Sequence, residues 1–319
     1  MNIADLLTER IIKTKNPTVI GLDPDLRKIP ACYKKAQENN QTPLFSAAQA
    51  ILEFNRDIID TVSPFIPAVK PQIAFYEKYG SYGVVAFEKT VAYAKSKGLV
   101  VITDAKRNDI GNTAKAYADA HLGTVEVLDG TRVVAFDADF LTVTPFLGSE
   151  SIYPFVSVCK DNNKGIFVLV KTSNSSSGEI QDVITKSGLT VSQSIAKYID
   201  ENAQSFMGEY GYSSIGAVVG ATYPEEAETL RKLMPRSYFL VPGYGAQGGT
   251  AHDILPCFNT DGLGAVVNSS RGILYNHISD ELREISTKED YLLSVKNAVI
   301  EMQKEIYTAL KNEYPQMVY

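Results

Sequence analysis

Residues 99–113 read Leu-Val-Val-Ile-Thr-Asp-Ala-Lys-Arg-Asn-Asp-Ile-Gly-Asn-Thr. The apolar, β-branched start of this stretch is typical of a strand that is buried on both faces of a parallel sheet. The run ends in Asp104, Lys106 and Asp109, which are too polar for a core. In parallel α/β proteins, ligands bind at the carboxyl ends of the strands. Asp104 and Lys106 are two residues apart, so on an extended backbone their side chains point the same way. We therefore expect a functional charge cluster here.

Seven further short apolar segments repeat this pattern and alternate with helical segments. The eight predicted strands are residues 18–22, 68–69, 100–102, 140–143, 165–170, 215–220, 238–241 and 265–267. Helices are predicted at residues 1–16, 47–63, 83–97, 112–128, 149–161, 190–207, 224–233 and 288–311. Strands that alternate with helices form parallel sheets, and eight such units predict a (β/α)8 barrel, or TIM barrel. We expect residues 1–319 to form one α/β domain.

Composition narrows the class of protein. The 31 basic and 37 acidic residues give a net charge of −6, so we expect no bulk attraction to nucleic acid or to an anionic membrane. No signal-peptide segment and no apolar run long enough to span a membrane is recognised. Three scattered cysteines without metal-ligand spacing suit a cytoplasmic protein with reduced thiols. His121, His252 and His277 lie away from the strand ends, and we expect ordinary surface or packing roles for them.

The loops after the last two strands have the features of a phosphate site. Residues 243–249 contain four glycines, whose backbone N–H groups can approach an anion closely, and Arg271 follows the eighth strand. These two loops form the recurrent phosphate site of the TIM barrel. The glycines alone would also suit tight turns. Residues 243–248 fit the dinucleotide fingerprint G-x-G-x-x-G, but they come after six strand–helix units and lack an acidic residue at the next strand end, so we reject that interpretation.

At the other end of the site, Lys70, Asp104, Lys106 and Asp109 can alternate in one hydrogen-bonded network. Each ammonium then has carboxylate neighbours, which keep it protonated. A charged lysine can stabilise a developing carbanion and protonate it, but it is poorly suited to Schiff-base chemistry. A purely structural ion-pair network is the alternative. The adjacent phosphate site favours function.

These motifs resemble those of the orotidine 5′-phosphate decarboxylase family. Residues 104–110, followed by Asn112 and Thr113, are similar to its D-x-K-x-x-D-I signature, and residues 242–249 and 268–272 are similar to its two phosphate loops. Residues 21–25, 70–71 and 171–174 resemble the longer subgroup that is found in many bacteria and in malaria parasites. One departure is Gly111, where many members have proline.

The resemblance implies cofactor-independent conversion of orotidine 5′-monophosphate (OMP) to uridine 5′-monophosphate (UMP) and CO2 in pyrimidine biosynthesis, without a metal. It implies that Lys106 protonates C6 and that Asp104 lies against the substrate carboxylate. It also implies a homodimer in which Asp109 and Thr113 serve the neighbouring subunit's site. The remaining implied contacts are Lys70 and Asp23 to the ribose, Thr172 and Ser173 to the pyrimidine, and Gln247, Gly248 and Arg271 to the phosphate.

Two alternatives remain. A metal-dependent hexulose-phosphate synthase or a related sugar-phosphate decarboxylase has a similar D-x-K-x-x-D motif, but it uses a carboxylate at the second strand end to help bind Mg2+. Lys70 occupies that position here and would repel the cation. A catalytically silent nucleotide-binding protein is the second alternative, and the complete charged cluster argues against it.

Overall fold

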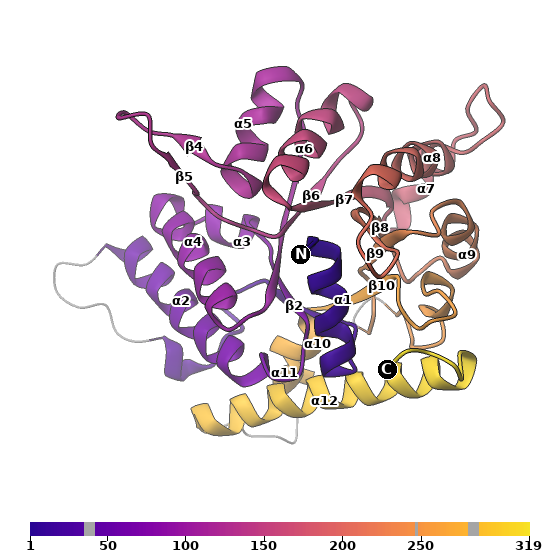
Figure 1. The fold of residues 1–319 in the computed structure, drawn as a ribbon. Helices are drawn as coiled ribbons and strands as arrows, with labels where there is room; N and C mark the ends of the chain where they lie inside the picture. The colour runs from indigo at the N-terminus through magenta and orange to yellow at the C-terminus, as the bar shows by residue number, and fades with distance from the viewer. Residues whose placement is uncertain (35–41, 246–247, 280–286) are drawn as a thin grey trace.

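Eight parallel strands close into a barrel, which confirms the predicted fold class (Figure 1). The computed structural model describes residues 1–34, 42–245, 248–279 and 287–319. Around the barrel the strands follow the order β1-β10-β9-β8-β7-β6-β3-β2, so the first and last strands are neighbours. Their bounds are β1 Thr18–Leu22, β2 Ala68–Pro71, β3 Val100–Arg107, β6 Phe140–Val143, β7 Gly165–Lys171, β8 Ser213–Val219, β9 Ser237–Val241 and β10 Ala265–Ser269.

Helices surround the barrel, and several begin at capping residues that the sequence supplies. Thr42 caps α2, which has Pro43 in its first turn, and Thr190 with Gln193 forms a capping box at α8. The α-helices are α1 Ile3–Thr14, α2 Pro43–Val62, α3 Ala74–Glu77, α4 Gly80–Ser96, α5 Gly111–Leu122, α6 Ser149–Asn162, α7 Gly178–Gln181, α8 Val191–Ala203, α9 Pro224–Leu233, α10 Arg271–Leu274, α11 Asn276–Ser279 and α12 Lys288–Glu313. Short 3-10 turns are η1 Ala31–Tyr33, η2 Ser175–Ser177, η3 Gln204–Phe206 and η4 Leu255–Cys257. Among the described residues no helix is both long and apolar enough to cross a membrane.

The amino-terminal helix α1 covers the end of the barrel at which the strands begin. It lies in the middle of the ring of helices in Figure 1, and Thr8 Oγ1 lies 2.7 Å from the hydroxyl of Tyr238 on β9. Inside the barrel, the rings of Phe140 on β6 and Phe167 on β7 pack with their centroids 5.0 Å apart. A Cβ at Gly165 would lie only 2.3 Å from the Phe140 ring, so this packing requires glycine there. Because one end is filled, space for a ligand remains at the carboxyl end.

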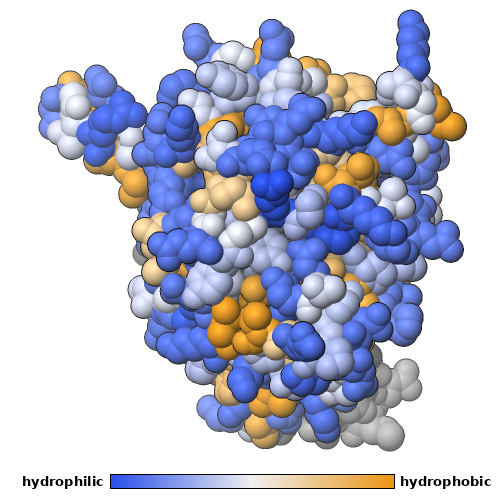
Figure 2. Space-filling view, turned by 45° about the vertical axis from the view of Figure 1, so that its right-hand side comes forward, coloured by the Kyte–Doolittle hydropathy of each residue, from blue (hydrophilic) through white to orange (hydrophobic). Residues whose placement is uncertain are grey.

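The segment after α5 differs from its prediction. A helix was expected over residues 112–128, but α5 ends at Leu122, and β4 (Val125–Glu126) pairs antiparallel with β5 (Arg132–Val133). The hairpin projects from the body of the molecule in Figure 1, and Leu128 near its tip is fully exposed. The face of the molecule that Figure 2 shows is mostly hydrophilic, with separate hydrophobic patches. Strands of two residues are too short to give a period-2 pattern for a prediction to detect.

Candidate active site

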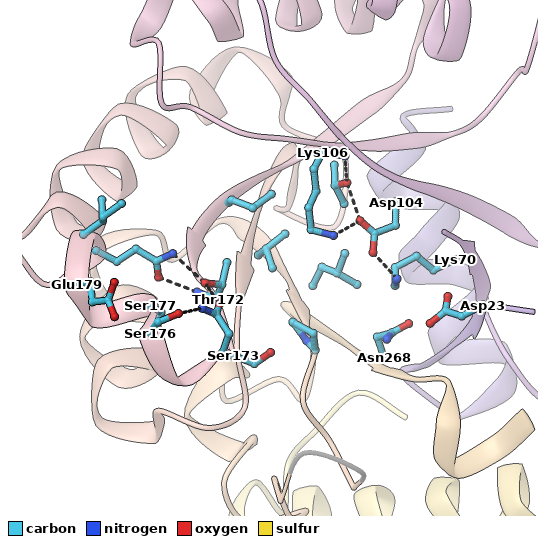
Figure 3. A pocket seen from close by; sticks show the side chains of 18 residues that line it. Asp23, Lys70, Asp104, Lys106, Thr172, Ser173, Ser176, Ser177, Glu179 and Asn268 are labelled. Carbon is cyan, nitrogen blue, oxygen red and sulfur yellow. Dashed lines mark hydrogen bonds and ion pairs between the residues drawn. The ribbon is translucent and has the colours of Figure 1, made fainter. Parts of the chain in front are cut away.

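A cavity of about 640 Å³ lies at the carboxyl ends of the barrel strands. The Lys70–Asp104–Lys106 charges line one side of it, and hydroxyl-bearing side chains together with Glu179 line the other, as Figure 3 shows. The predicted site residues that line it are Asp23, Lys70, Asp104, Lys106, Thr172 and Ser173. They come from the ends of four different strands, so the closed barrel brings together residues that are far apart in the sequence.

Asp104 is the centre of the charged side. Its Oδ2 accepts a hydrogen bond from Lys70 Nζ at 2.6 Å, and its Oδ1 accepts one from Lys106 Nζ at 2.6 Å. The side chains of Asp104 and Lys70 are 10% and 6% exposed, whereas that of Lys106 is 48% exposed. The two lysines therefore differ in access. Lys70 is a buried partner of the carboxylate, and Lys106 presents its ammonium group to the cavity.

The charges of this cluster stabilise one another. Burial alone raises the pKa of the Asp104 carboxyl, but Lys70 and Lys106 outweigh that effect and hold it well below its usual range. Burial alone lowers the pKa of Lys70, but the carboxylates of Asp104 and Asp23 outweigh it, so the pKa is raised. At neutral pH the cavity therefore holds charges of both signs, and the hydrogen bonds between them fix their positions. Such a preorganised arrangement can stabilise charge that develops on a ligand.

The backbone that carries Lys106 is not extended as expected. Lys106 has φ +46°, in the left-handed region, and the pairing of β3 with β6 is interrupted between Thr103 and Arg107. The prediction that Asp104 and Lys106 meet is correct, since their charged groups form an ion pair. The reason given for it, alternation along a regular strand, is wrong at this bulge.

Asp109 and Thr113 lie apart from this cluster. Asp109 Oδ1 accepts a hydrogen bond from the N–H of Ile110, and Thr113 is exposed on the first turn of α5. Within the described part of the chain, neither residue lines this cavity or the one beside it. The predicted four-residue network is therefore a three-residue network within one chain. Gly111, between these residues, has φ +53°, a value that proline cannot adopt.

A second cavity, of about 350 Å³, adjoins the first and contains Arg271. Asp23, Pro242 and Asn268 line both cavities and so mark their boundary. Asp23 Oδ1 and Asn268 Oδ1 are buried without a hydrogen-bond partner among the described residues, which leaves two acceptors for a ligand's hydroxyl groups. Lys28 lines the same cavity as Arg271 and supplies a further cation.

The glycine-rich loop after β9 is described only in part. Gln247 lies outside the described residues. Gly248 is exposed with φ +95°, and it lines a separate surface groove between this loop and α12. The first helical element after the glycines is the short turn η4 at 255–257. A dinucleotide fingerprint needs a helix that starts at its glycines, so this arrangement agrees with the rejection of that motif.

The segment after β7 forms the opposite side of the main cavity. Here η2 and α7 form two short helical turns. Gln181 Oε1 accepts from the N–H of Thr172 at 2.9 Å, and Gln181 Nε2 donates to Thr172 Oγ1 at 2.8 Å. Lys171 Nζ donates to both carboxylate oxygens of Asp182, at 2.6 and 2.7 Å. These contacts hold the segment against the end of β7.

Several residues that line the two cavities were not predicted as site residues, among them Thr142, Asn268 and Lys28. Asn268 begins the motif around Arg271, so its place at a strand end was a usable signal. Lys28 lies after the first strand in a segment without a recognisable pattern. Thr142 is an ordinary strand former in sequence, and nothing there distinguishes it from its neighbours.

Comparisons with known proteins agree on one family. The family model "Orotidine 5'-phosphate decarboxylase / HUMPS family" matches residues 19–281. An orotidine 5′-phosphate decarboxylase of Rhodopirellula baltica is 43% identical over 306 residues, covering 96% of this chain and 99% of that protein. One of Caldicellulosiruptor saccharolyticus is 39% identical over 298 residues, covering 92% and 96%. The solved structure of Leishmania donovani OMP decarboxylase matches with a TM-score of 0.71 at 26% identity, covering 97% of this chain and 99% of that one. The relatives thus match the chain along nearly its whole length.

Proposed function

The chain belongs to the orotidine 5′-phosphate decarboxylase / HUMPS family, and we propose that it converts OMP to UMP and CO2 in pyrimidine biosynthesis. The observation that carries this proposal is the Lys70–Asp104–Lys106 cluster in a cavity that adjoins the cavity of Arg271. This arrangement suits a ligand with a reacting ring at one end and a phosphate at the other.

In the proposed reaction, the bond between C6 and the carboxylate of OMP breaks, and its electron pair stays on C6. The resulting carbanion has little resonance stabilisation, so fixed positive charge must stabilise it. The Lys106 ammonium group supplies that charge and then gives its proton to C6, and the neutral amine regains a proton from water. Asp104 holds Lys106 in place and lies against the substrate carboxylate, which favours the loss of CO2.

The rest of the substrate is bound at a distance from the reacting carbon. Lys70 and Asp23 bind the ribose, and Thr172 and Ser173 contact the pyrimidine. Arg271 binds the phosphate in the cavity that it lines. The family resemblance adds Gln247 and Gly248 to the phosphate site, although Gly248 lines a separate groove in this structure. Binding energy from such remote groups can offset the cost of holding two carboxylates together.

We also propose that the active form is a homodimer of this single catalytic domain, residues 1–319. Asp109 and Thr113 then enter the site of the second copy, which agrees with their absence from both cavities of their own chain. In that site Asp109 completes the network of alternating charges. The three cysteines carry free thiols in the structure, which suits the reducing cytoplasm.

The family also includes the alternative of a metal-dependent sugar-phosphate enzyme. Lys70 argues against that activity, because its buried ammonium group lies 2.6 Å from Asp104, where a divalent cation would need a second carboxylate. We therefore propose that no metal or other cofactor takes part. A silent nucleotide-binding protein is the other alternative, and the exposed Lys106 ammonium group argues against it.

A decarboxylation assay tests these proposals. We expect the absorbance of OMP to fall on addition of the wild-type protein, equally with and without EDTA. Lys106→Ala, checked for folding by circular dichroism, should abolish the change. Failure of the wild type to turn OMP over would refute the enzyme assignment. Activity that EDTA abolishes and Mg2+ restores would support the metal-dependent alternative.

A further inference from the structure

Thr142 on β6 has an unusual set of contacts beneath the charged cluster. Its Oγ1 accepts hydrogen bonds from the backbone N–H groups of Ala105 at 3.0 Å and Lys106 at 2.9 Å. The same hydroxyl donates to Asp104 Oδ1 at 3.0 Å. A hydroxyl has one donor and two acceptor lone pairs, so these three bonds use its whole capacity. Thr142 is 1% exposed, so water does not compete for these bonds.

These contacts compensate for the bulge in β3. Thr103 pairs with Leu141 and Arg107 with Val143, so three residues of β3 stand opposite Thr142 alone. In a regular ladder, strand carbonyls would accept the N–H groups of such residues, but here a side-chain hydroxyl does so. It also fixes Lys106 at φ +46°, a conformation that residues with a Cβ rarely adopt.

We propose that Thr142 is a positioning residue for the decarboxylation, an inference that rests on the proposed function. Its hydroxyl holds the backbone of Lys106 and one oxygen of Asp104 at the same time, and so sets where the Lys106 ammonium group lies relative to that carboxylate. Lys70 donates to the other carboxylate oxygen of Asp104, Oδ2, to which Thr142 does not hydrogen-bond. Thr142 therefore acts through Lys106 and Asp104 and takes no proton itself.

The matched test compares three substitutions. Thr142→Val keeps the shape of the side chain and removes the hydroxyl, whereas Thr142→Ser keeps the hydroxyl. Thr103→Val makes the same chemical change one residue before Asp104, where the fully buried Thr103 Oγ1 has no hydrogen-bond partner among the described residues. It controls for the loss of any buried strand hydroxyl next to the cluster.

We expect T142V to lower kcat about 100-fold, the order of loss for one preorganising group, and to change KM less than about threefold. T142S should retain kcat within about fivefold, and T103V within about twofold. An unchanged kcat in T142V, an equal loss in T142S, or an equal loss in T103V would each overturn the proposal. If T142V does not fold, Thr142→Cys replaces it, since the thiol is only a weak donor and acceptor, although cysteine also lacks the methyl group of threonine.

A crystal structure of T142V gives a readout that does not depend on activity. We expect Lys106 to leave the left-handed region and its Nζ to leave Asp104 Oδ1. An unchanged Lys106 backbone would refute the positioning role. If the wild type fails to turn OMP over, the proposed function falls, and this structural comparison still decides whether Thr142 holds the bulge.

Discussion

The ion pair between Lys171 and Asp182 connects the end of β7 to the segment that lines one side of the main cavity. Replacing Asp182 with asparagine tests how much this ion pair contributes to stability. Lys171 Nζ lies 2.6 and 2.7 Å from the two carboxylate oxygens and 4.4 Å from the centre of the Tyr223 ring. The Lys171 side chain is 1% exposed and that of Asp182 is 45% exposed. Asparagine keeps the shape of Asp182 but leaves the buried ammonium group without its counter-charge.

The burial of the pair sets the expected magnitude. Breaking a buried pair costs about 3–5 kcal/mol, whereas exposed pairs contribute less than about 1 kcal/mol. With one partner buried and the other half-exposed, we expect D182N to lower the free energy of unfolding by about 2 kcal/mol. Unfolding 319 residues gains an entropy of about 0.7 kcal/mol/K, so Tm should fall by about 3 °C.

The chain offers a control pair with the same separation and a different environment. Lys232 Nζ also lies 2.6 Å from Glu228, but these side chains are 72% and 61% exposed. Glu228→Gln should therefore cost less than about 0.5 kcal/mol. The assay is urea and thermal unfolding of both variants beside the wild type. Equal losses in D182N and E228Q would refute the argument that burial, not distance, decides the contribution.

Three other predictions concern the phosphate, the dimer and a buried histidine. Arg271→Ala should raise KM for OMP roughly 30- to 100-fold, because charge-assisted hydrogen bonds to the phosphate are lost. The KM for orotidine, which lacks the phosphate, should not change. An equal increase in KM for both substrates would contradict a phosphate-binding role of Arg271. The Asp109→Ala and Lys106→Ala proteins, each inactive alone, should regain about a quarter of wild-type activity when mixed. Half of the dimers would then be mixed dimers, and each of these would have one intact site out of two. No recovery of activity despite demonstrated subunit exchange would contradict a site shared between subunits. Burial, with a smaller effect of Arg107, lowers the pKa of His121 to about 3. Between about pH 3 and pH 6.5 the unfolded state therefore binds more protons at this residue than the folded state does. The stability from the neutral side chain is present above pH 6.5 and lost as pH falls, by about 2–3 kcal/mol at pH 4.5. Urea unfolding at pH 7.5 and 4.5 should show a smaller difference for His121→Leu than for the wild type, and an equal difference would refute this account.

The barrel was predictable because its strands are short, apolar and regularly spaced between helices. Seven of the strands match the expected segments closely, and the eighth, β3, continues past Ile102 to Arg107. The helix predicted over residues 112–128 was wrong after Leu122 because Gly123 ends it and a short exposed hairpin follows. Local pattern carries little information about two-residue strands.

The candidate site was predictable where a charged residue ends a strand. Asp23, Lys70 and Asp104 are recognisable in this way, since charges are unexpected after an apolar run. Thr142 is not, because its contacts depend on a bulge in a neighbouring strand and on the positive φ of Lys106. Backbone irregularities of this kind arise from tertiary packing and leave no composition signal.

The pairing of β1 with β10 has a consequence for the order in which the protein is made. One edge of β1 is covered early by β2, but the other edge waits for β10, whose first residue, Ala265, follows Leu22 by about 240 residues. At translation rates of about 5–20 residues per second, that edge stays open for roughly 10–50 s. An open parallel edge is a template for incorrect pairing. We therefore expect newly made chains to be most prone to aggregate late in synthesis, when seven of the eight strands exist and the barrel is still open.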